Sequence, residues 1–447
     1  MKKILLINPW IYDFAAFDLW SKPLGLLYVG AMLRRFGFEI YLIDCLDRHQ
    51  PGAEGKSKKF GTGKYRRTIV EKPKILAHIP RHWARYGISE ERFVELLHAV
   101  PRPDAVLITS IMTYWYPGVK RAVQLVREHL GPVPTILGGI YATLLPDHAR
   151  KVINPDYIIT GPGEIKTLLL LSELFDIPID RAKLPKSLDE YPFPAFDLYR
   201  HHDYMVILTS RGCPFNCSFC AQRLISMPYT RRSVENVLDE FEYHHKKFGV
   251  VDFAFYDDAL FLHKERHIIP ILRGILERGL KLRLHTPNGL FARLVDPQLA
   301  ELMFAAGVKT VRLSFETANE NRRQQMSMKV SNADLVRAIR TLERAGYRRS
   351  EIDVYVMMGL PGQPLSEVEE SIRFVHSLGA KVRLASFSPI HGTEEFRRAV
   401  RMGLISRDID PLLTNNSIFP LARNREEYEK FQQLRNLAKE LNAALET

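Results

Sequence analysis

The stretch "MVILTSRGCPFNCSFC", residues 205 to 220, joins a strand-like apolar run to a loop that holds three cysteines. Cys213, Cys217 and Cys220 lie close together, whereas the whole chain of 447 residues has only 4 cysteines. So few cysteines exclude a disulfide framework in a chain of this length. A structural zinc site needs a fourth ligand, and none follows at zinc-finger spacing. Three thiolates on one loop instead suit a cubane iron–sulfur cluster with one iron left open.

The cysteine loop follows the first of six strand–helix repeats between residues 204 and 395. The strand-like runs are "MVILTS", "DFAFYD", "KLRLHT", "TVRLSF", "IDVYVMM" and "VRLASFS". Asp296-Pro297 predicts the start of one helix and Gly307 its end, and Ser366 with Glu369 predicts a capping box on a later one. Repeated βα units predict a parallel, partial (β/α)6 barrel, whose chemistry lies at the carboxyl ends of its strands. The thiols are therefore expected at the catalytic end.

Residues 1–180 show a second alternation of strands and helices. Their apolar runs are "KILLIN", "EIYLID", "AVLITS", "PTILGG" and "DYIITG", and Gly37 is a plausible stop for the first helix. This pattern predicts an α/β domain with a doubly wound, Rossmann-like parallel sheet. A basic insertion, residues 47–90, interrupts it after the second strand. Residues 181–203 are expected to form a linker and residues 396–447 a helical extension.

Composition narrows the class of protein. The net charge of +12 is concentrated in the basic insertion, which can be a solvated surface, a clamp for an anionic ligand or a nucleic-acid contact. Tyr65 and Trp83 are interleaved with its charges, which favours the last reading, but no nucleic-acid motif accompanies them. No apolar run approaches the roughly 18 residues of a membrane span, and the start is too short for a signal peptide. We expect a cytoplasmic protein with no membrane partner.

The spacing C-x-x-x-C-x-x-C after a first barrel strand resembles that of the radical S-adenosylmethionine superfamily. The resemblance implies a [4Fe–4S] cluster on the three cysteines, with S-adenosylmethionine bound to the open iron and cleaved to a 5′-deoxyadenosyl radical. It also implies that the cofactor meets residues at the strand ends, which are Phe219, Asp257, Asp258, Ser314, Glu316, Gly359 and Gly362. Core packing, helix capping and tight turns explain the same residues without a ligand. His391, after the sixth strand, either faces a substrate or is structural.

The domain in front of the barrel resembles the cobalamin-binding type. The resemblance implies probable cobalamin binding at the ends of the fourth and fifth strands, at Gly138, Gly139, Gly161, Gly163 and Glu164. Glycine backbone lets a large ligand approach, although plain turns explain these residues too. "DRHQPG", residues 47–52, matches the D-x-H-x-x-G pattern that places a histidine on cobalt, but it follows a different strand and we interpret it as coincidence.

This two-domain arrangement implies a cobalamin-dependent methyltransferase acting on an unactivated carbon. Low-potential electrons imply a reductant such as flavodoxin or ferredoxin. One alternative is a cobalamin-independent radical enzyme that performs cyclisation, rearrangement or sulfur insertion. An alternative of another class is a nucleic-acid-binding protein with a structural cluster, for which a salt-dependent affinity would argue. The sequence identifies neither the substrate, a small molecule or peptide, nor a catalytic side chain, and it leaves the oligomeric state open.

Overall fold

The computed structural model describes residues 1–326 and 330–446. The chain divides into two compact units, of which the first comprises Met1–Asp203, Leu224–Met227 and Pro411–Leu413. The second unit comprises the remainder and begins at Tyr204. The segment expected to be a linker, residues 181–203, belongs to the first unit, where the Ala195 amide donates to the Leu27 carbonyl at 3.2 Å. No helix among the described residues is both long and apolar enough to cross a bilayer.

The first unit contains a five-stranded sheet in which every pairing is parallel. Its strands, in spatial order, are β10 (Tyr157–Ile158), β9 (Thr135–Leu137), β8 (Ala105–Ile108), β1 (Lys3–Asn8) and β4 (Glu39–Asp44). When the five strands are numbered by their order in the chain and read from β4 to β10, they lie in the order 2-1-3-4-5, which is the flavodoxin-like arrangement. The predicted doubly wound sheet is confirmed. The strand order reverses between β1 and β8, so a crevice is expected at their carboxyl ends.

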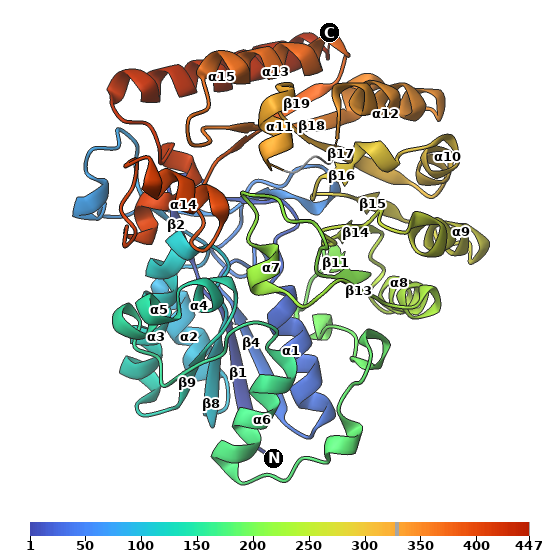
Figure 1. Ribbon diagram of the computed structural model, residues 1–447. Coiled ribbons are helices and arrows are strands. Elements are labelled where there is room, and N and C mark those ends of the chain that lie inside the picture. Colours follow the sequence, from blue (N-terminus) through green and yellow to red (C-terminus); the bar gives the residue numbers. More distant parts are fainter. Residues whose placement is uncertain (327–329, 447) are drawn as a thin grey trace. The chain divides into compact units, whose positions relative to one another are not determined.

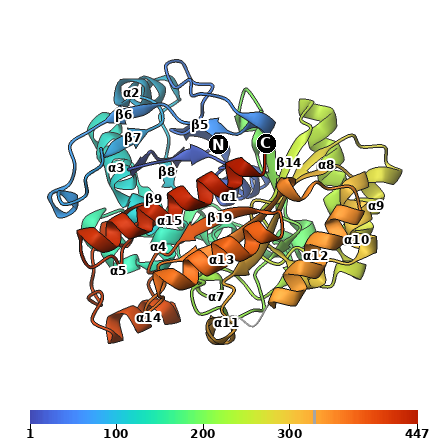
Figure 2. The same ribbon diagram turned by 90° about the horizontal axis from the view of Figure 1, so that it is seen from above.

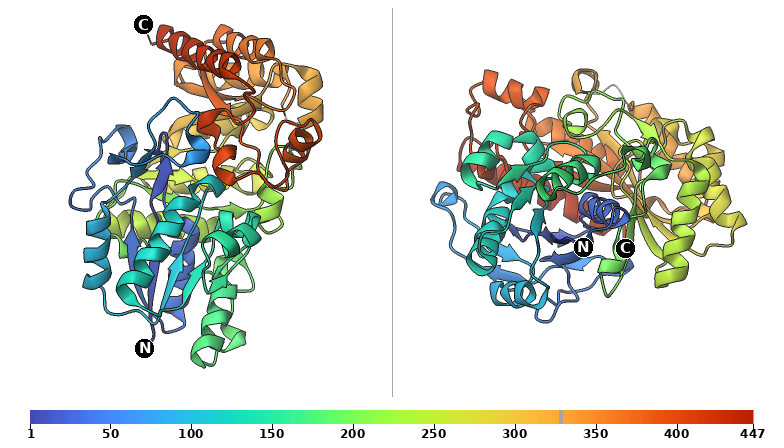
Figure 3. Two further views of the ribbon diagram at one scale, coloured as in Figure 1. Left: turned by 90° about the vertical axis from the view of Figure 1, so that its left-hand side faces the viewer. Right: turned by 90° about the horizontal axis from the view of Figure 1, so that it is seen from below.

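Helices cover both faces of this sheet, as Figures 1 and 3 show. The helices are α1 (Leu24–Arg35), α2 (Glu90–Ala99), α3 (Tyr116–Leu130), α4 (Ile140–Leu144), α5 (Pro146–Val152) and α6 (Glu164–Phe175). Alternate strand residues face opposite ways, so Leu6 packs with α1 and α6 while Leu5 packs with α2 and α3. The predicted stop of α1 is confirmed, because Gly37 has φ of 88° just after the helix.

The basic insertion pairs with a segment that follows β1, which the sequence did not lead us to expect. Two small antiparallel sheets result: β2 (Ile11–Asp13), β7 (Ala84–Tyr86) and β6 (Arg67–Ile69) form one, and β3 (Phe17–Asp18) with β5 (Gly63–Lys64) forms the other. Buried Arg48 joins the two segments through an ion pair with Asp18 at 2.9 Å. Tyr65 and Trp83 are buried as well, which removes the aromatic argument for a nucleic-acid contact.

The second unit is a parallel barrel-like sheet that follows chain order, so the predicted six βα repeats are confirmed. Its strands are β11 (Met205–Ile207), β14 (Asp252–Phe255), β15 (Arg283–His285), β17 (Val308–Glu316), β18 (Ile352–Met358) and β19 (Lys381–Ser386), and β16 (Leu290–Phe291) adds a pairing to β17. A short antiparallel pair, β12 (Ser210–Arg211) and β13 (Thr230–Arg231), flanks the cysteine loop. All carboxyl ends of the parallel strands meet at one edge.

Helices line the outside of this sheet (Figure 2). They are α8 (Val234–Phe248), α9 (Ile268–Glu277), α10 (Pro297–Ala305), α12 (Asn332–Arg344), α13 (Leu365–Ser377) and α15 (Arg425–Ala444). The short helices α7 (Gln222–Ile225), α11 (Glu320–Met326) and α14 (Glu394–Arg401) belong to the segments that follow β11, β17 and β19. The predicted cap of α10 is confirmed, since Asp296 accepts from the Leu299 amide at 2.9 Å. The capping box at Ser366 is wrong, because α13 begins at Leu365 after Pro364.

The last helix, α15, occupies the place of a sixth barrel helix. It packs against α13 and β19. Its Asn442 side chain accepts from the Val382 amide and donates to the Val382 carbonyl, both at 2.8 Å. An edge strand carries unpaired backbone groups, and these two bonds satisfy those of Val382 on β19. The predicted helical extension is therefore part of the second unit's sheet architecture.

Candidate functional site

The three cysteines lie on the loop between β11 and α7, at the carboxyl end of the first barrel strand. Cys217 is buried, Cys213 is half-buried and Cys220 is exposed. A turn tightens the end of the loop, where the Cys220 amide donates to the Cys217 carbonyl at 3.1 Å. The donor set, three soft thiolates, is the one that an iron–sulfur cluster takes. No three metal-ligating side chains converge within residues 1–326 and 330–446, so cluster binding requires the thiols to turn toward one point.

Phe219 packs with residues from the ends of two neighbouring strands. Its ring contacts a buried apolar cluster that contains Met357 near the end of β18, Leu360 after β18 and Phe387 after β19. Both predicted glycines of the following turn have positive φ, 90° for Gly359 and 67° for Gly362. Such angles favour glycine, so the tight turn accounts for both residues without a ligand. The arrangement gives the cysteine loop an apolar wall.

Asp257 is held by the first strand. Its carboxylate accepts from the Thr209 hydroxyl at 2.7 Å, from the Ser210 hydroxyl at 2.5 Å and from the Thr209 amide at 3.1 Å. Burial raises the pKa of this carboxyl despite these bonds. Asp258, next in the chain, is half-buried and accepts from the Gln222 side chain, two residues beyond Cys220. Of the two acids, Asp258 is therefore the one bonded to the cysteine segment.

His267 completes the buried group around Thr209, and its protonation predicts a pH dependence of stability. Its Nε2 lies 2.7 Å from the Thr209 hydroxyl, and burial lowers its pKa from 6.5 to about 4. Between pH 4 and 6.5 the unfolded chain therefore binds more protons than the folded chain, so the free energy of unfolding rises with pH in this range. The stabilising contribution of neutral His267 is complete above pH 6.5 and is lost as pH falls toward 4. His267→Gln should remove about 3 kcal/mol of the acid-induced loss of unfolding free energy.

Denaturant unfolding followed at several pH values between 4 and 7.5 measures this effect. The control is His263→Gln, since His263 is exposed and should leave the pH slope as it is. An equal slope in the wild type and the His267→Gln variant would contradict the assignment.

Ser314 and Glu316 lie at the end of β17 on its inner face. The Ser314 hydroxyl donates to the Leu290 carbonyl at 3.1 Å, which ties β17 to β16. Glu316 has φ of 75°, and the pairing with β18 shifts register between Ser314 and Glu316. A non-glycine residue in this region costs about 1–3 kcal/mol, and such strain gathers at functional sites. This backbone strain makes Glu316 a stronger candidate than Ser314 for contact with a ligand. The sequence did not reveal it.

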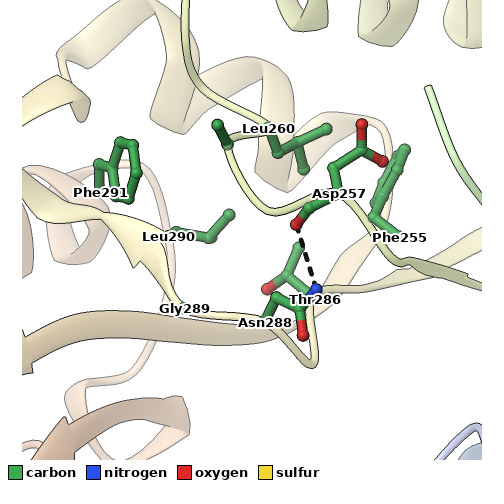
Figure 4. Close-up of a pocket in the computed structure, with 9 residues that line it drawn as sticks. Phe255, Asp257, Leu260, Thr286, Asn288, Gly289, Leu290 and Phe291 are labelled. Atoms are coloured by element: carbon green, nitrogen blue, oxygen red, sulfur yellow. Dashed lines mark hydrogen bonds between the residues drawn. The ribbon is translucent and has the colours of Figure 1, made fainter. Parts of the chain in front are cut away.

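Asn288 is a site residue that the sequence analysis missed. Its side-chain amide donates to the carbonyls of Tyr256 at 2.9 Å and Asp257 at 3.2 Å, so it links the loops after β14 and β15. Asn288 lines a small pocket together with other residues at these strand ends (Figure 4). The asparagine–glycine pair Asn288-Gly289 gave only a turn signal in the sequence, since its long-range partners are not visible there.

The first unit has a cavity at the point where its strand order reverses. It is small and is lined by residues at the ends of β1 and β8 and in the segments that follow them, among them Asn8, Trp10, Ser110, Met112 and Trp115. A corrin is far larger than this cavity, which has room for little more than one water molecule. The location is the one that doubly wound sheets use for ligands.

Gly138 and Gly139 form the turn beside this cavity. Gly138 contacts the β8 end, because its carbonyl accepts from the Ser110 hydroxyl at 2.7 Å. Gly139 has φ of 93° and ψ of −167°, a conformation that is essentially confined to glycine. A Cβ on Gly139 would lie 2.2 Å from the Ser110 carbonyl oxygen. The backbone is therefore closely packed here, which explains Gly139 without a ligand, while the turn lies on the strand-end side where doubly wound sheets bind ligands.

The other predicted residues of the first unit begin the loop into α6. The Gly161 amide donates to the Thr143 hydroxyl at 2.9 Å, Gly163 is the residue before α6, and Glu164 is buried at its first position. His49, the histidine of the D-x-H-x-x-G match, lies 3.0 Å from the Asp203 carboxylate through its Nε2. That pairing explains His49 without cobalt. The structure brings Gly161 close to α4, on the same strand-end side as Gly139.

Two family models match the chain. The model described as "Radical SAM superfamily" matches residues 207–375, which run from the last residue of β11 into α13. The model described as "B12 binding domain" matches residues 80–169, which contain β8, β9 and β10. The remaining strands of that sheet, β1 and β4, precede the match and complete the doubly wound order. A radical SAM domain implies a [4Fe–4S] cluster and S-adenosylmethionine, and a B12-binding domain implies cobalamin.

Two curated relatives and one solved structure show what this chain is similar to. Cytidylyl-2-hydroxyethylphosphonate methyltransferase of Streptomyces wedmorensis is 24% identical, with 90% of this chain and 83% of the relative covered. Anaerobic magnesium-protoporphyrin IX monomethyl ester cyclase of Rubrivivax gelatinosus is 24% identical over 64% of this chain and 56% of its own. The structure of the radical S-adenosylmethionine methyltransferase TsrM from Kitasatospora setae, with cobalamin and [4Fe-4S] cluster bound, has a TM-score of 0.67 at 18% identity and covers 96% and 84%. That likeness concerns the fold.

Proposed function

We propose that this chain, a radical S-adenosylmethionine protein with a B12-binding domain, is a cobalamin-dependent methyltransferase acting on an unactivated carbon. The observation that carries the proposal is the cysteine loop at the end of β11. The first unit of the same chain adds a glycine turn beside a cavity at the ends of its strands. The bound cofactors supply the radical and methyl-transfer chemistry, while the protein positions them. We assign residues 1–180 to the cobalamin domain, 181–203 to a linker that packs against this domain, 204–395 to the radical domain and 396–447 to its helical extension.

The side chains at the strand ends then have separate tasks. Cys213, Cys217 and Cys220 hold the cluster. Phe219 packs near the adenine of S-adenosylmethionine, and the carboxylates of Asp258 and Glu316 accept from its polar groups, since a carboxylate suits a cation or a hydroxyl. Asp257 keeps the end of β14 in register with β11 through its bonds to the segment that follows β11. We assign Gly138, Gly139, Gly161, Gly163 and Glu164 to the cobalamin site.

The experiment uses S-adenosylmethionine labelled in its methyl group. Protein loaded with iron, sulfide and corrinoid, and reduced without oxygen, should transfer label to the corrinoid fraction and also release 5′-deoxyadenosine. Protein reconstituted without corrinoid should lose the first product and keep the second. Release of 5′-deoxyadenosine with no label in the corrinoid fraction of the fully loaded protein would reject methyl transfer and leave a radical enzyme.

A second candidate is a radical cyclisation or rearrangement. The 24% identity to the magnesium-protoporphyrin ester cyclase favours it, although 64% of this chain is covered there against 90% for the phosphonate methyltransferase. The same labelling experiment separates the two candidates, because only methyl transfer moves the labelled carbon.

Electron supply and location complete the proposal. Radical cleavage of S-adenosylmethionine requires an external low-potential reductant, and we assign this role to a flavodoxin or ferredoxin in the cytoplasm. The acceptor is a small molecule or peptide. The burial of Tyr65 and Trp83 leaves these two rings unable to stack on bases, so nucleic acid is not the acceptor that we propose.

A further inference from the structure

Ser218 lies between two of the cluster cysteines, and all of its polar groups are engaged. Its amide donates to the Met326 carbonyl at 2.9 Å, its hydroxyl donates to Glu395 Oε1 at 2.8 Å, and its carbonyl accepts from the Glu395 amide at 3.0 Å. One residue, Glu395, therefore makes two of the three bonds. The segment between Cys217 and Cys220 is fixed to the first turn of α14 by this clamp.

Glu395 lies in the first turn of α14, where the helix dipole favours an acid, but its side chain is buried. It is 3% exposed, and its second carboxylate oxygen, Oε2, is buried with no hydrogen-bond partner among the described residues. An unsatisfied buried acceptor costs about 1–3 kcal/mol, and more when it is charged. The N-cap of α14 is supplied by Thr393, which accepts from the Phe396 amide at 3.2 Å, so capping does not explain the acid. The site thus keeps a costly carboxylate beside the cysteine loop.

We infer that Glu395 is a positioning residue for the iron–sulfur cluster, acting through Ser218. The clamp holds the Cys217–Cys220 segment in place while the thiols take the cluster, and outer-shell partners of this kind are worth 10–100-fold in metal affinity or activity. The negative carboxylate also opposes the addition of an electron, because charge and hydrogen bonding near a cluster set its potential. The inference rests on the cluster alone and is independent of methyl transfer.

Three variants of the reconstituted full chain test this role. Glu395→Gln keeps the shape and removes the charge, and Ser218→Ala removes the hydroxyl of the clamp. Glu394→Gln is the matched control, because Glu394 is the preceding residue, is 47% exposed and pairs with Arg397 and Arg401 on the surface. The readouts are bound iron per chain, the electron paramagnetic resonance spectrum of the reduced cluster and its midpoint potential.

We expect the control to match the wild type in all three readouts. Glu395→Gln should favour the reduced cluster about tenfold at a fixed potential, which equals a rise of about 59 mV for one electron. Ser218→Ala should bind less iron or show an altered spectrum, and the double variant should add little to either single change because the residues form one unit. Cleavage rates are not needed for this comparison.

An unchanged potential, spectrum and iron content in both single variants would show that Glu395 only anchors α14. If Glu395→Gln does not fold, Ser218→Ala decides the question, since Ser218 is half-buried on a loop and its change is small. An unaltered cluster in that variant would then overturn the inference. A failure here would leave the labelling test of methyl transfer untouched.

Discussion

Cys217→Ala should abolish reductive cleavage of S-adenosylmethionine, with a loss of more than about 100-fold, because even outer-shell changes at metal sites cost 10–100-fold. Cys217 is the buried member of the three thiols, so no water-exposed group can replace it easily. Bound iron should fall with it, while corrinoid binding by the first unit should remain. The measurements are iron content, release of 5′-deoxyadenosine and corrinoid absorbance on the same preparation.

Cys45→Ala is the matched control for this prediction. Cys45 is also buried, but it follows β4 in the first unit, and burial raises its pKa well above the usual range, which keeps the thiol protonated. Removing it should leave iron content and cleavage as they are. Full cleavage activity in Cys217→Ala, or loss of iron in Cys45→Ala, would contradict the assignment of the cluster to the barrel loop.

Gly139→Ala should reduce corrinoid binding more than about tenfold and destabilise the first unit. The backbone conformation of Gly139 alone costs alanine about 1–3 kcal/mol, and the new Cβ would meet the Ser110 carbonyl oxygen at 2.2 Å. That carbonyl belongs to the loop that lines the strand-end cavity, so relieving the contact has to move the cavity wall. Corrinoid absorbance per chain and thermal unfolding of the apo protein measure the two effects.

Gly37→Ala separates the effect of backbone strain from the effect of moving the cavity wall. Gly37 has φ of 88°, but a Cβ there meets nothing within 4 Å. This variant should be destabilised by strain alone and should still bind corrinoid as the wild type does. Normal corrinoid binding in Gly139→Ala would show that the turn after β9 is no part of the cobalamin site.

The main architecture could be read from the sequence because its signals are local. Apolar runs mark the strands, and the cysteine spacing after "MVILTS" places the thiols at a strand end. The small sheets could not be read, because β2 and β6 are short strands that pair with β7 across long loops. Asn288 and Glu395 could not be predicted as site residues for the same reason. Their partners, Asp257 and Ser218, lie far away in sequence, so only the folded chain joins them.

Predictions from single turns had mixed outcomes for a physical reason. The cap at Asp296 was right because proline at the first helical position reinforces it. The box at Ser366 failed because Pro364 precedes the helix and sets its start two residues earlier. The D-x-H-x-x-G match at residues 47–52 likewise depends on context, and in the fold His49 pairs with Asp203.

The corrinoid content of the loaded protein shows whether one chain combines a radical SAM cluster with cobalamin. The protein would be produced with cobalamin uptake, its cluster reconstituted without oxygen, and corrinoid absorbance counted against iron and protein. We expect about one corrinoid per chain beside one [4Fe–4S] cluster. A full cluster with active S-adenosylmethionine cleavage and no bound corrinoid would contradict it.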